Sequence, residues 1–143
     1  MKKDHIRDYA VAAFRLYASL GCPTLAQAEQ KIRQQSYRRY STCEPQRQLI
    51  KAEQAIRESC AELADIEAVE KTLLLLIENG KPHVVAAVKA IYFANPKYPL
   101  RKGEISERVL RLSLSMPAST QTVYKWLKES RQLFALLRGL RIE

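Results

Sequence analysis

Apolar residues recur every three or four positions along almost the whole chain, which is the spacing of one face of an α-helix. Such stripes run over residues 5–20, 25–40, 45–64 and 66–78 and continue beyond residue 82. The chain contains only four glycines and six prolines, too few for the many turns of a β-sandwich or barrel. We therefore expect an all-α protein of six or seven helices without a sheet.

Turn and capping residues separate these stripes. Gly21-Cys22-Pro23 ends the first stripe, Thr24 is a suitable cap for the next helix, and Pro45 suits a first helical turn. Asp65 is expected to cap a helix over 66–78. No glycine or proline lies between residues 46 and 79, so the pattern leaves open whether 45–78 forms one bent helix or two.

The middle of the chain is its most apolar part. The run from Leu73 to Ile77 is apolar on every side of a helix, which predicts a central buried helix. Asn79-Gly80 is expected to end it and Pro82 to begin the next helix, with residues 95–99 as a loop. We expect 25–40 and 45–64 to form an antiparallel hairpin. The predicted division is an N-terminal helical region, 1–64, followed by a second domain, 65–143.

Positive charge is concentrated toward the two ends. The chain has 24 Lys and Arg against 15 Asp and Glu, a net charge of +9, which favours a polyanionic partner. Residues 100–143 carry nine basic and four acidic side chains, whereas 65–99 carry four of each. The C-terminal segment is therefore the first place to look for a nucleic-acid contact.

Residues 104–139 have the pattern of two helices joined by a short turn. Pro117-Ala118 interrupts the helical spacing, and Ser119 is a good N-cap for a second helix over about 119–138. One side of this helix is apolar, and Trp126 is expected to hold it on the core. The opposite side carries Gln121, Lys125, Lys128 and Gln132. This arrangement is typical of a helix-turn-helix that binds DNA.

The string Ser119-Thr120-Gln121-Thr122-Val123-Tyr124-Lys125-Trp126-Leu127 resembles the Ser-x-x-Thr-Val-Tyr-Arg-x-Leu pattern of bacterial helix-turn-helix proteins. Over residues 65–140 the chain resembles region four of sigma factors and the small phage regulators of the ArpU and RinA types. Ile91-Tyr92-Phe93 matches the helix that precedes the bihelical unit in that family. Pro117 and Ser113 depart from the glycine and alanine that are usual there. The resemblance implies a C-terminal helix-turn-helix bundle and a regulator of phage late genes.

We therefore expect a sequence-specific DNA-binding transcriptional regulator of phage or prophage type. Its expected partners are double-stranded DNA and RNA polymerase. The alternative is a helical adaptor that binds polymerase or another acidic protein without touching DNA. The expected DNA contacts are Arg101, Lys102, Arg108, Arg111, Ser119, Thr120, Gln121, Thr122, Tyr124, Lys125, Lys128 and Arg131.

The N-terminal region is expected to support self-association. A dimer would present two recognition helices to two half-sites, and the 24–64 hairpin is the predicted element for a homodimer. The stretch from Lys31 to Arg47 interleaves basic residues with Tyr37 and Tyr40, a composition that can bind phosphates. We favour the simpler interpretation of a solvated hairpin tip.

Nothing in the sequence indicates an enzyme, a metal site or a cofactor. The three cysteines form no Cys-x-x-Cys, the two histidines stand alone, and no glycine-rich phosphate loop occurs. Unpaired cysteines favour reduced thiols and a cytoplasmic location. No apolar run reaches the roughly 18 residues of a membrane span, so we expect no membrane partner.

Overall fold

The computed structural model describes residues 4–140, and this range contains seven helices and no strand. The expected all-α class is confirmed. The helices are α1 (His5–Ser19), α2 (Leu25–Arg39), α3 (Pro45–Glu58), α4 (Cys60–Glu78), α5 (Pro82–Ile91), α6 (Glu104–Ser115) and α7 (Thr120–Arg138).

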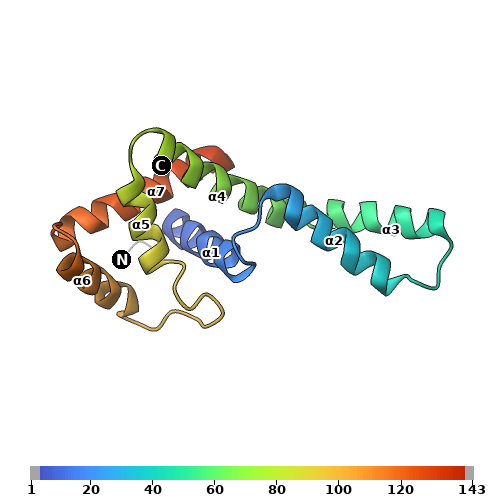
Figure 1. Cartoon of the computed structure of the whole chain (residues 1–143), viewed down its shortest axis with the longest axis horizontal. Helices are drawn as coiled ribbons and strands as arrows, with labels where there is room; N and C mark the ends of the chain where they lie inside the picture. The colour runs from blue at the N-terminus through green and yellow to red at the C-terminus, as the bar shows by residue number, and fades with distance from the viewer. Residues whose placement is uncertain (1–3, 141–143) are drawn as a thin grey trace.

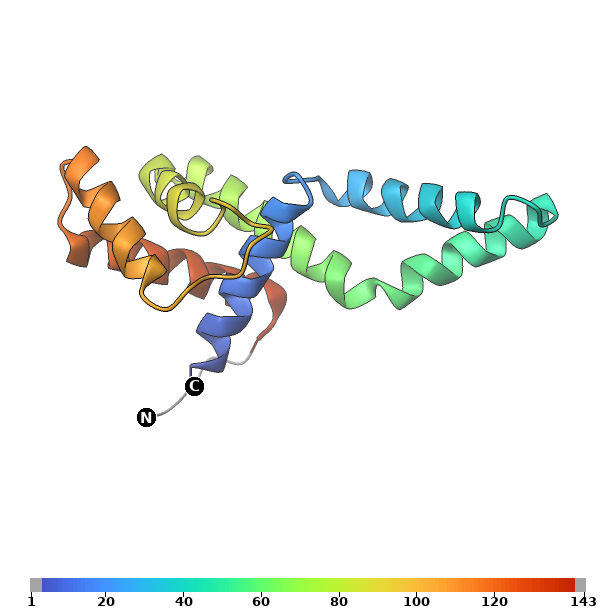
Figure 2. The ribbon, with the colours of Figure 1, turned by 90° about the horizontal axis from the view of Figure 1, so that it is seen from below.

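The helices form a body with a projecting arm (Figures 1 and 2). The body consists of α1 and α4 to α7, and α7 packs against the other four. The arm consists of α2 and α3, which lie antiparallel and contact each other and, of the other described helices, only α4. The turn between α6 and α7 lies at the opposite end of the long axis from the arm tip (Figure 1).

Several helix boundaries follow from local chemistry, as expected. Thr24 accepts a hydrogen bond from the Gln27 backbone N–H, and the Gln27 side chain accepts one from the Thr24 N–H. Pro45 stands in the first turn of α3. Gly80 ends α4 with φ of +72°, a conformation that costs a residue with a Cβ about 1–2 kcal/mol.

The segment 45–78 forms two helices, because α3 ends at Glu58 and α4 begins at Cys60 after a bend at Ser59 (Figure 2). Asp65 therefore lies inside α4 and caps nothing, contrary to expectation. Its carboxylate instead accepts hydrogen bonds from the Tyr9 hydroxyl and the Arg138 Nε, both at 2.7 Å. This pairing with Asp65 raises the pKa of Arg138.

The core of the body contains side chains from both ends of the chain. Phe14 of α1 is fully buried, and its ring centroid lies 5.6 Å from those of Tyr92 and Phe134. The expected division at residue 64 falls within α4 and separates α1 from this core. The packing instead groups α1 with α4 to α7, and only α2 and α3 stand apart.

A buried arginine holds the loop between α5 and α6. The Arg15 guanidinium donates hydrogen bonds to the backbone carbonyls of Tyr92, Ala94, Asn95 and Tyr98. Burial is the main cause of the lowered pKa of Arg15. Four backbone acceptors that would otherwise need water are satisfied by one side chain, so α1 sets the path of the chain into α6.

The apolar run in α4 is only partly buried. Leu73 and Leu76 face the core, but Leu74 and Ile77 are about half exposed, so the expected burial on every side is wrong for these two residues. Between residues 4 and 140, none of the helices combines the length and the apolar character that crossing a membrane requires.

Candidate nucleic-acid interface

The turn between α6 and α7 spans residues 116–119. The Ser119 hydroxyl accepts a hydrogen bond from the Thr122 backbone N–H at 3.2 Å, so Ser119 is the N-cap that the sequence predicted. Met116, the C-cap of α6, has an extended backbone conformation, with φ −121° and ψ 149°. Met116 and this capped start therefore give α7 a fixed direction relative to α6.

One stripe of α7 is anchored in the body. Val123, Leu127 and Phe134 are fully buried, as the periodicity predicted. Ser130 is buried among them, and its hydroxyl donates to the Leu127 carbonyl at 2.6 Å, which removes the cost of an unpaired polar group. The opposite stripe is exposed and consists of Gln121, Lys125, Lys128 and Gln132.

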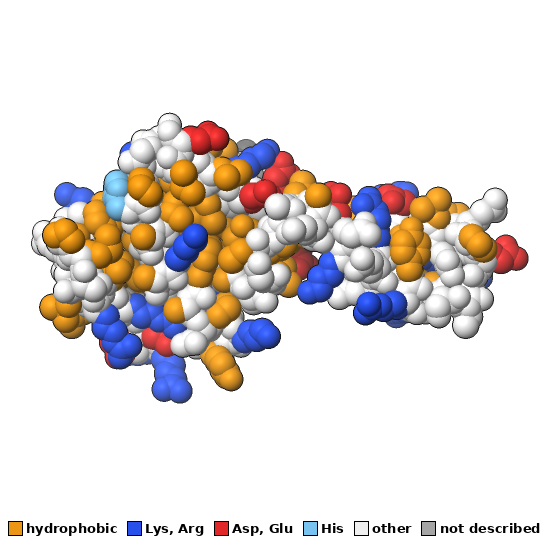
Figure 3. All heavy atoms as spheres, viewed as in Figure 1, with side chains coloured by type: hydrophobic (Ala, Val, Ile, Leu, Met, Phe, Trp, Pro, Cys, Tyr) orange, Lys and Arg blue, Asp and Glu red, His pale blue; other side chains and the backbone are white. Residues whose placement is uncertain are grey.

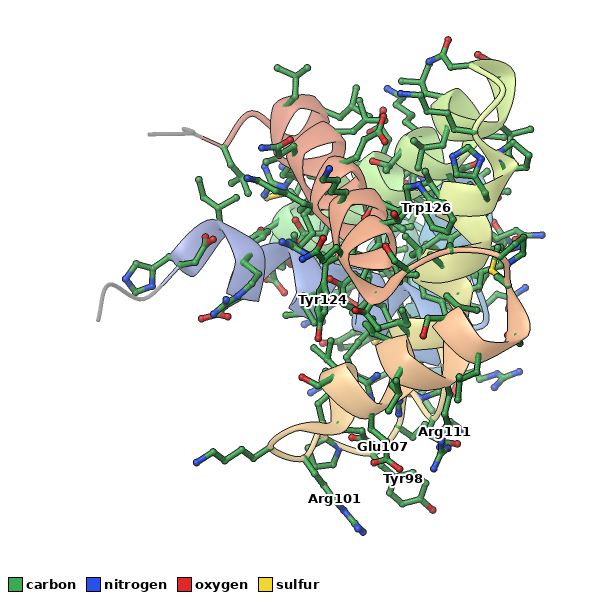
Figure 4. The ribbon with its side chains drawn as sticks, turned by 90° about the vertical axis from the view of Figure 1, so that its left-hand side faces the viewer. Tyr98, Arg101, Glu107, Arg111, Tyr124 and Trp126 are labelled. Carbon is green, nitrogen blue, oxygen red and sulfur yellow. The ribbon has the colours of Figure 1, made fainter. Side chains whose placement is uncertain are left out.

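Two aromatic side chains flank the exposed stripe. In Figure 4, Tyr124 and Trp126 point to opposite sides of α7, which lies in front of the body. The Tyr124 hydroxyl is 3.2 Å from the Ser106 hydroxyl of α6, and Trp126 packs beside His83 of α5, with ring centroids 4.9 Å apart. The exposed stripe between these residues therefore faces outward at the end of the molecule away from the arm.

The exposed stripe of α7 is cationic. Glu129 is the single carboxylate in the sequence of α7, and it is paired with Lys81. Lys125 and Lys128 form no ion pair with any residue from 4 to 140. Two ammonium groups and two amides are thus presented without a competing free carboxylate on the same helix.

Further cations project from α6 and the loop before it. Arg101 and Lys102 are exposed, and Arg111 forms an exposed ion pair with Glu107 at 2.6 Å. Figure 4 shows Arg101 and Arg111 pointing away from α7, on the far side of α6. An exposed pair of this kind contributes little stability, so Arg111 can exchange Glu107 for a phosphate at small cost.

Arg108, an expected phosphate contact, has another role in the structure. Its side chain is 11% exposed, and it donates to the Ile91 carbonyl and to the Glu104 carboxylate. The backbone N–H of Arg101, followed by this guanidinium, lowers the pKa of Glu104. Arg108 therefore ties α6 to the end of α5, and moving it to a phosphate would leave a carbonyl unpaired.

Two cations, Arg131 of α7 and Arg7 of α1, lie where α7 faces α1. Arg131 donates to the Tyr92 hydroxyl at 2.8 Å and has no carboxylate partner among the described residues. A hollow of about 540 Å³ between α1, α6 and α7 is bordered by Arg131, Tyr124, Arg7 and Asp8, and the Arg7 Nε lies 3.5 Å from the Asp8 carboxylate in an exposed ion pair. Sequence reasoning missed Arg7, because no spacing signal connects the start of the chain with α7.

The remaining expected contacts lie at the start of α7. Thr120 and Thr122 are half-buried beside the exposed Ser119. The hydroxyls of Ser119 and Thr122 are 2.9 Å apart and hydrogen-bonded to each other. That bond uses one of the two hydroxyl protons, so the other hydroxyl keeps its proton free to donate to an acceptor such as a phosphate oxygen.

Trp126 packs against the core, as expected, but it is only partly buried. Trp126→Ala is therefore expected to lower the free energy of unfolding by about 2 kcal/mol, below the 3–5 kcal/mol typical of a fully enclosed ring. Urea denaturation measures this difference. Gln132→Ala, on the exposed stripe, is the control and should change stability by less than about 0.5 kcal/mol; an equal loss in both variants would contradict the packing role.

Comparison with protein-family models, with curated proteins and with solved structures gave no match to this chain. The likeness to ArpU-type and RinA-type regulators accordingly rests on sequence pattern alone, namely the Ser119 to Leu127 string and Ile91-Tyr92-Phe93 within residues 65–140. What the interface does is inferred from its own charges, exposure and geometry.

Proposed function

We propose that this protein is a sequence-specific DNA-binding transcriptional regulator of phage or prophage type, acting in the bacterial cytoplasm, with α7 as its recognition helix. The observation that carries the proposal is the exposed stripe over the first turns of α7. This stripe combines two lysines and two amide side chains without a free carboxylate on the helix. A major groove admits an α-helix and presents bases to amide and cationic side chains.

The proposal divides the contacts between base reading and phosphate binding. Gln121 lies in the first turn of α7, where a side chain reaches base edges, and a glutamine can bond adenine through two atoms. Lys125 and Lys128 lie one and two turns further along and supply positive charge. The hydroxyls of Thr120 and Thr122, beside Ser119, are suited to phosphate oxygens.

Cations around α7 extend the phosphate-binding surface. Arg7 and Arg131 supply charge on the α1 side of α7. Arg101 and Arg111 project from the far side of α6, so they and Lys102 supply charge beyond α6 and not beside the exposed stripe. Such contacts fix the position of a protein on the duplex without reading its sequence.

The adaptor function is retained as the second candidate because of one observation on α6. Leu110 and Leu114, one helical turn apart, are 53% and 80% exposed. Apolar side chains gain nothing from a phosphate backbone but are buried favourably against a protein. RNA polymerase or another acidic protein is the partner that this candidate requires.

The deciding experiment is selection from random duplex DNA, followed by titration at several salt concentrations on the selected and on a scrambled duplex. We expect tighter binding to the selected duplex and an affinity that falls steeply with salt, because bound cations release counterions from DNA. Absence of salt-dependent duplex binding would favour the adaptor.

Gln121→Ala tests base reading by α7. We expect a loss on the order of 1–3 kcal/mol at one base position of the selected site, and little change in the salt slope because no charge is removed. Gln34→Ala, on the exposed surface of α2, is the matched control and should bind as the parent protein does. A uniform loss over all sequences would contradict the assigned role of Gln121.

A further inference from the structure

The arm is a pair of helices without a third helix to cover it. Of the described helices, α2 and α3 contact only each other and α4 at the arm's base. The buried side chains of the arm are small, namely Ala28, Ser36 and Ala52. The larger apolar side chains of the arm include three that are exposed to solvent: Tyr37 is 37%, Leu49 55% and Ile50 65% exposed. Helical bundles normally cover such side chains with another helix.

Helical spacing places Tyr37 and Leu49 on one side of the arm, with Ile50 about 100° further round α3 from Leu49. The ion pair between Arg33 of α2 and Glu53 of α3, at 3.3 Å, marks this side. Tyr37 follows Arg33 by one turn, and Leu49 and Ile50 precede Glu53 by four and three residues, which are the spacings of helix neighbours. We call Tyr37, Leu49 and Ile50 the arm patch.

The rim of the arm patch is positive. Arg33 engages the carboxylates of both Glu29 and Glu53. Arg47 and Arg57, which flank Ile50 along α3, are exposed and form no ion pair within residues 4–140. Figure 3 shows apolar side chains interspersed with Lys and Arg along the arm. Over residues 25–58 the sequence has seven basic and four acidic side chains.

We propose that the arm patch binds an acidic amphipathic helix of another protein, which completes a three-helix bundle with α2 and α3. The apolar face of that helix covers Ile50 and its two neighbours, and its carboxylates pair with Arg47 and Arg57. Amphipathic helices that bind in this way insert apolar side chains, spaced three, four and seven residues apart along the helix, into an apolar surface. Opposite charges at the rim select the partner.

Charge complementarity favours this occupant over two others. A second copy of the chain would bring one positive arm against another, and juxtaposed like charges disfavour association. A nucleic acid would leave Leu49 and Ile50 without an apolar partner. The arm also lies at the end opposite α7 (Figure 1), so the proposal does not depend on DNA binding.

Two designed helical peptides test the proposal on the full-length chain. Both carry leucines at positions a and d of a heptad; one has glutamates elsewhere and the other lysines. We expect fluorescence anisotropy to show binding of the glutamate peptide only, weakened by salt. Ile50→Asp, and Arg47→Glu combined with Arg57→Glu, should each weaken binding at least tenfold. Lys31→Glu combined with Lys89→Glu, away from the arm patch, makes the same charge change and should not.

Each contrary result overturns the proposal in a different way. Absence of binding, or equal binding of both peptides, excludes an acidic partner. A dimer in sedimentation that Ile50→Asp converts to a monomer assigns the arm patch to the homodimer that the sequence predicted. A loss of duplex binding in the Arg47→Glu, Arg57→Glu variant, as large as that caused by changes in α7, assigns the surface to nucleic acid. Circular dichroism verifies that every variant stays helical.

Discussion

Replacing Lys125 and Lys128 together by alanine is expected to weaken binding to every duplex alike and to reduce the slope of log affinity against log salt by about two units. Each lysine on a phosphate releases close to one counterion, so each loss lowers the slope by roughly one. Neither side chain has an ion-pair partner in the described part of the chain, so stability should change little. Titrations at four or more salt concentrations measure the slope.

A control separates a specific α7 contact from the overall positive charge. Lys31→Ala with Lys89→Ala removes the same charge from α2 and α5, away from α7, and should leave the slope nearly unchanged. An equal fall in the control would mean that net charge, not the exposed stripe, binds the duplex. Arg108→Ala should instead lower stability, because the Ile91 carbonyl loses its donor.

Features that depend on neighbouring residues could be predicted from the sequence. The caps at Thr24 and Ser119 and the stop at Gly80 each depend on atoms within a few residues. The two stripes of α7 follow from helical spacing in the same way, because Val123 to Phe134 repeat at intervals that put them on one side.

Features that depend on distant residues could not be predicted. From the sequence, Arg108 is predicted to be an exposed cation. Only the fold brings its guanidinium to within 2.6 Å of the Ile91 carbonyl. The sequence predicts Asp65 as a helix cap, because the two residues that donate hydrogen bonds to its carboxylate, Tyr9 and Arg138, are 56 and 73 residues away along the chain. The exposure of Ile50 likewise could not be predicted before the fold showed that, between residues 4 and 140, no helix other than α4 at the base packs against the arm. The hydrophobic pattern predicts which side of each helix is buried, but it does not predict which helices pack against each other.

The position of α1 is the non-local feature with the largest expected effect on stability. Phe14→Ala removes a fully buried ring that touches Tyr92 and Phe134. We expect the free energy of unfolding to fall by about 3–5 kcal/mol, since a cavity adds to the lost transfer energy. That loss is a large fraction of the 5–15 kcal/mol typical of a domain. Urea denaturation of the full chain measures it.

Leu49→Ala on the arm is the contrasting variant and should cost less than about 1 kcal/mol, because the leucine is already half in solvent. The two variants distinguish the body observed here from the expected division at residue 64. If residues 65–143 folded independently of α1, the loss caused by Phe14→Ala would be confined to the N-terminal region, and a chain of 65–143 would be stable alone. We expect the opposite result, in which that fragment fails to give a cooperative transition because the pocket for Phe14 is left empty.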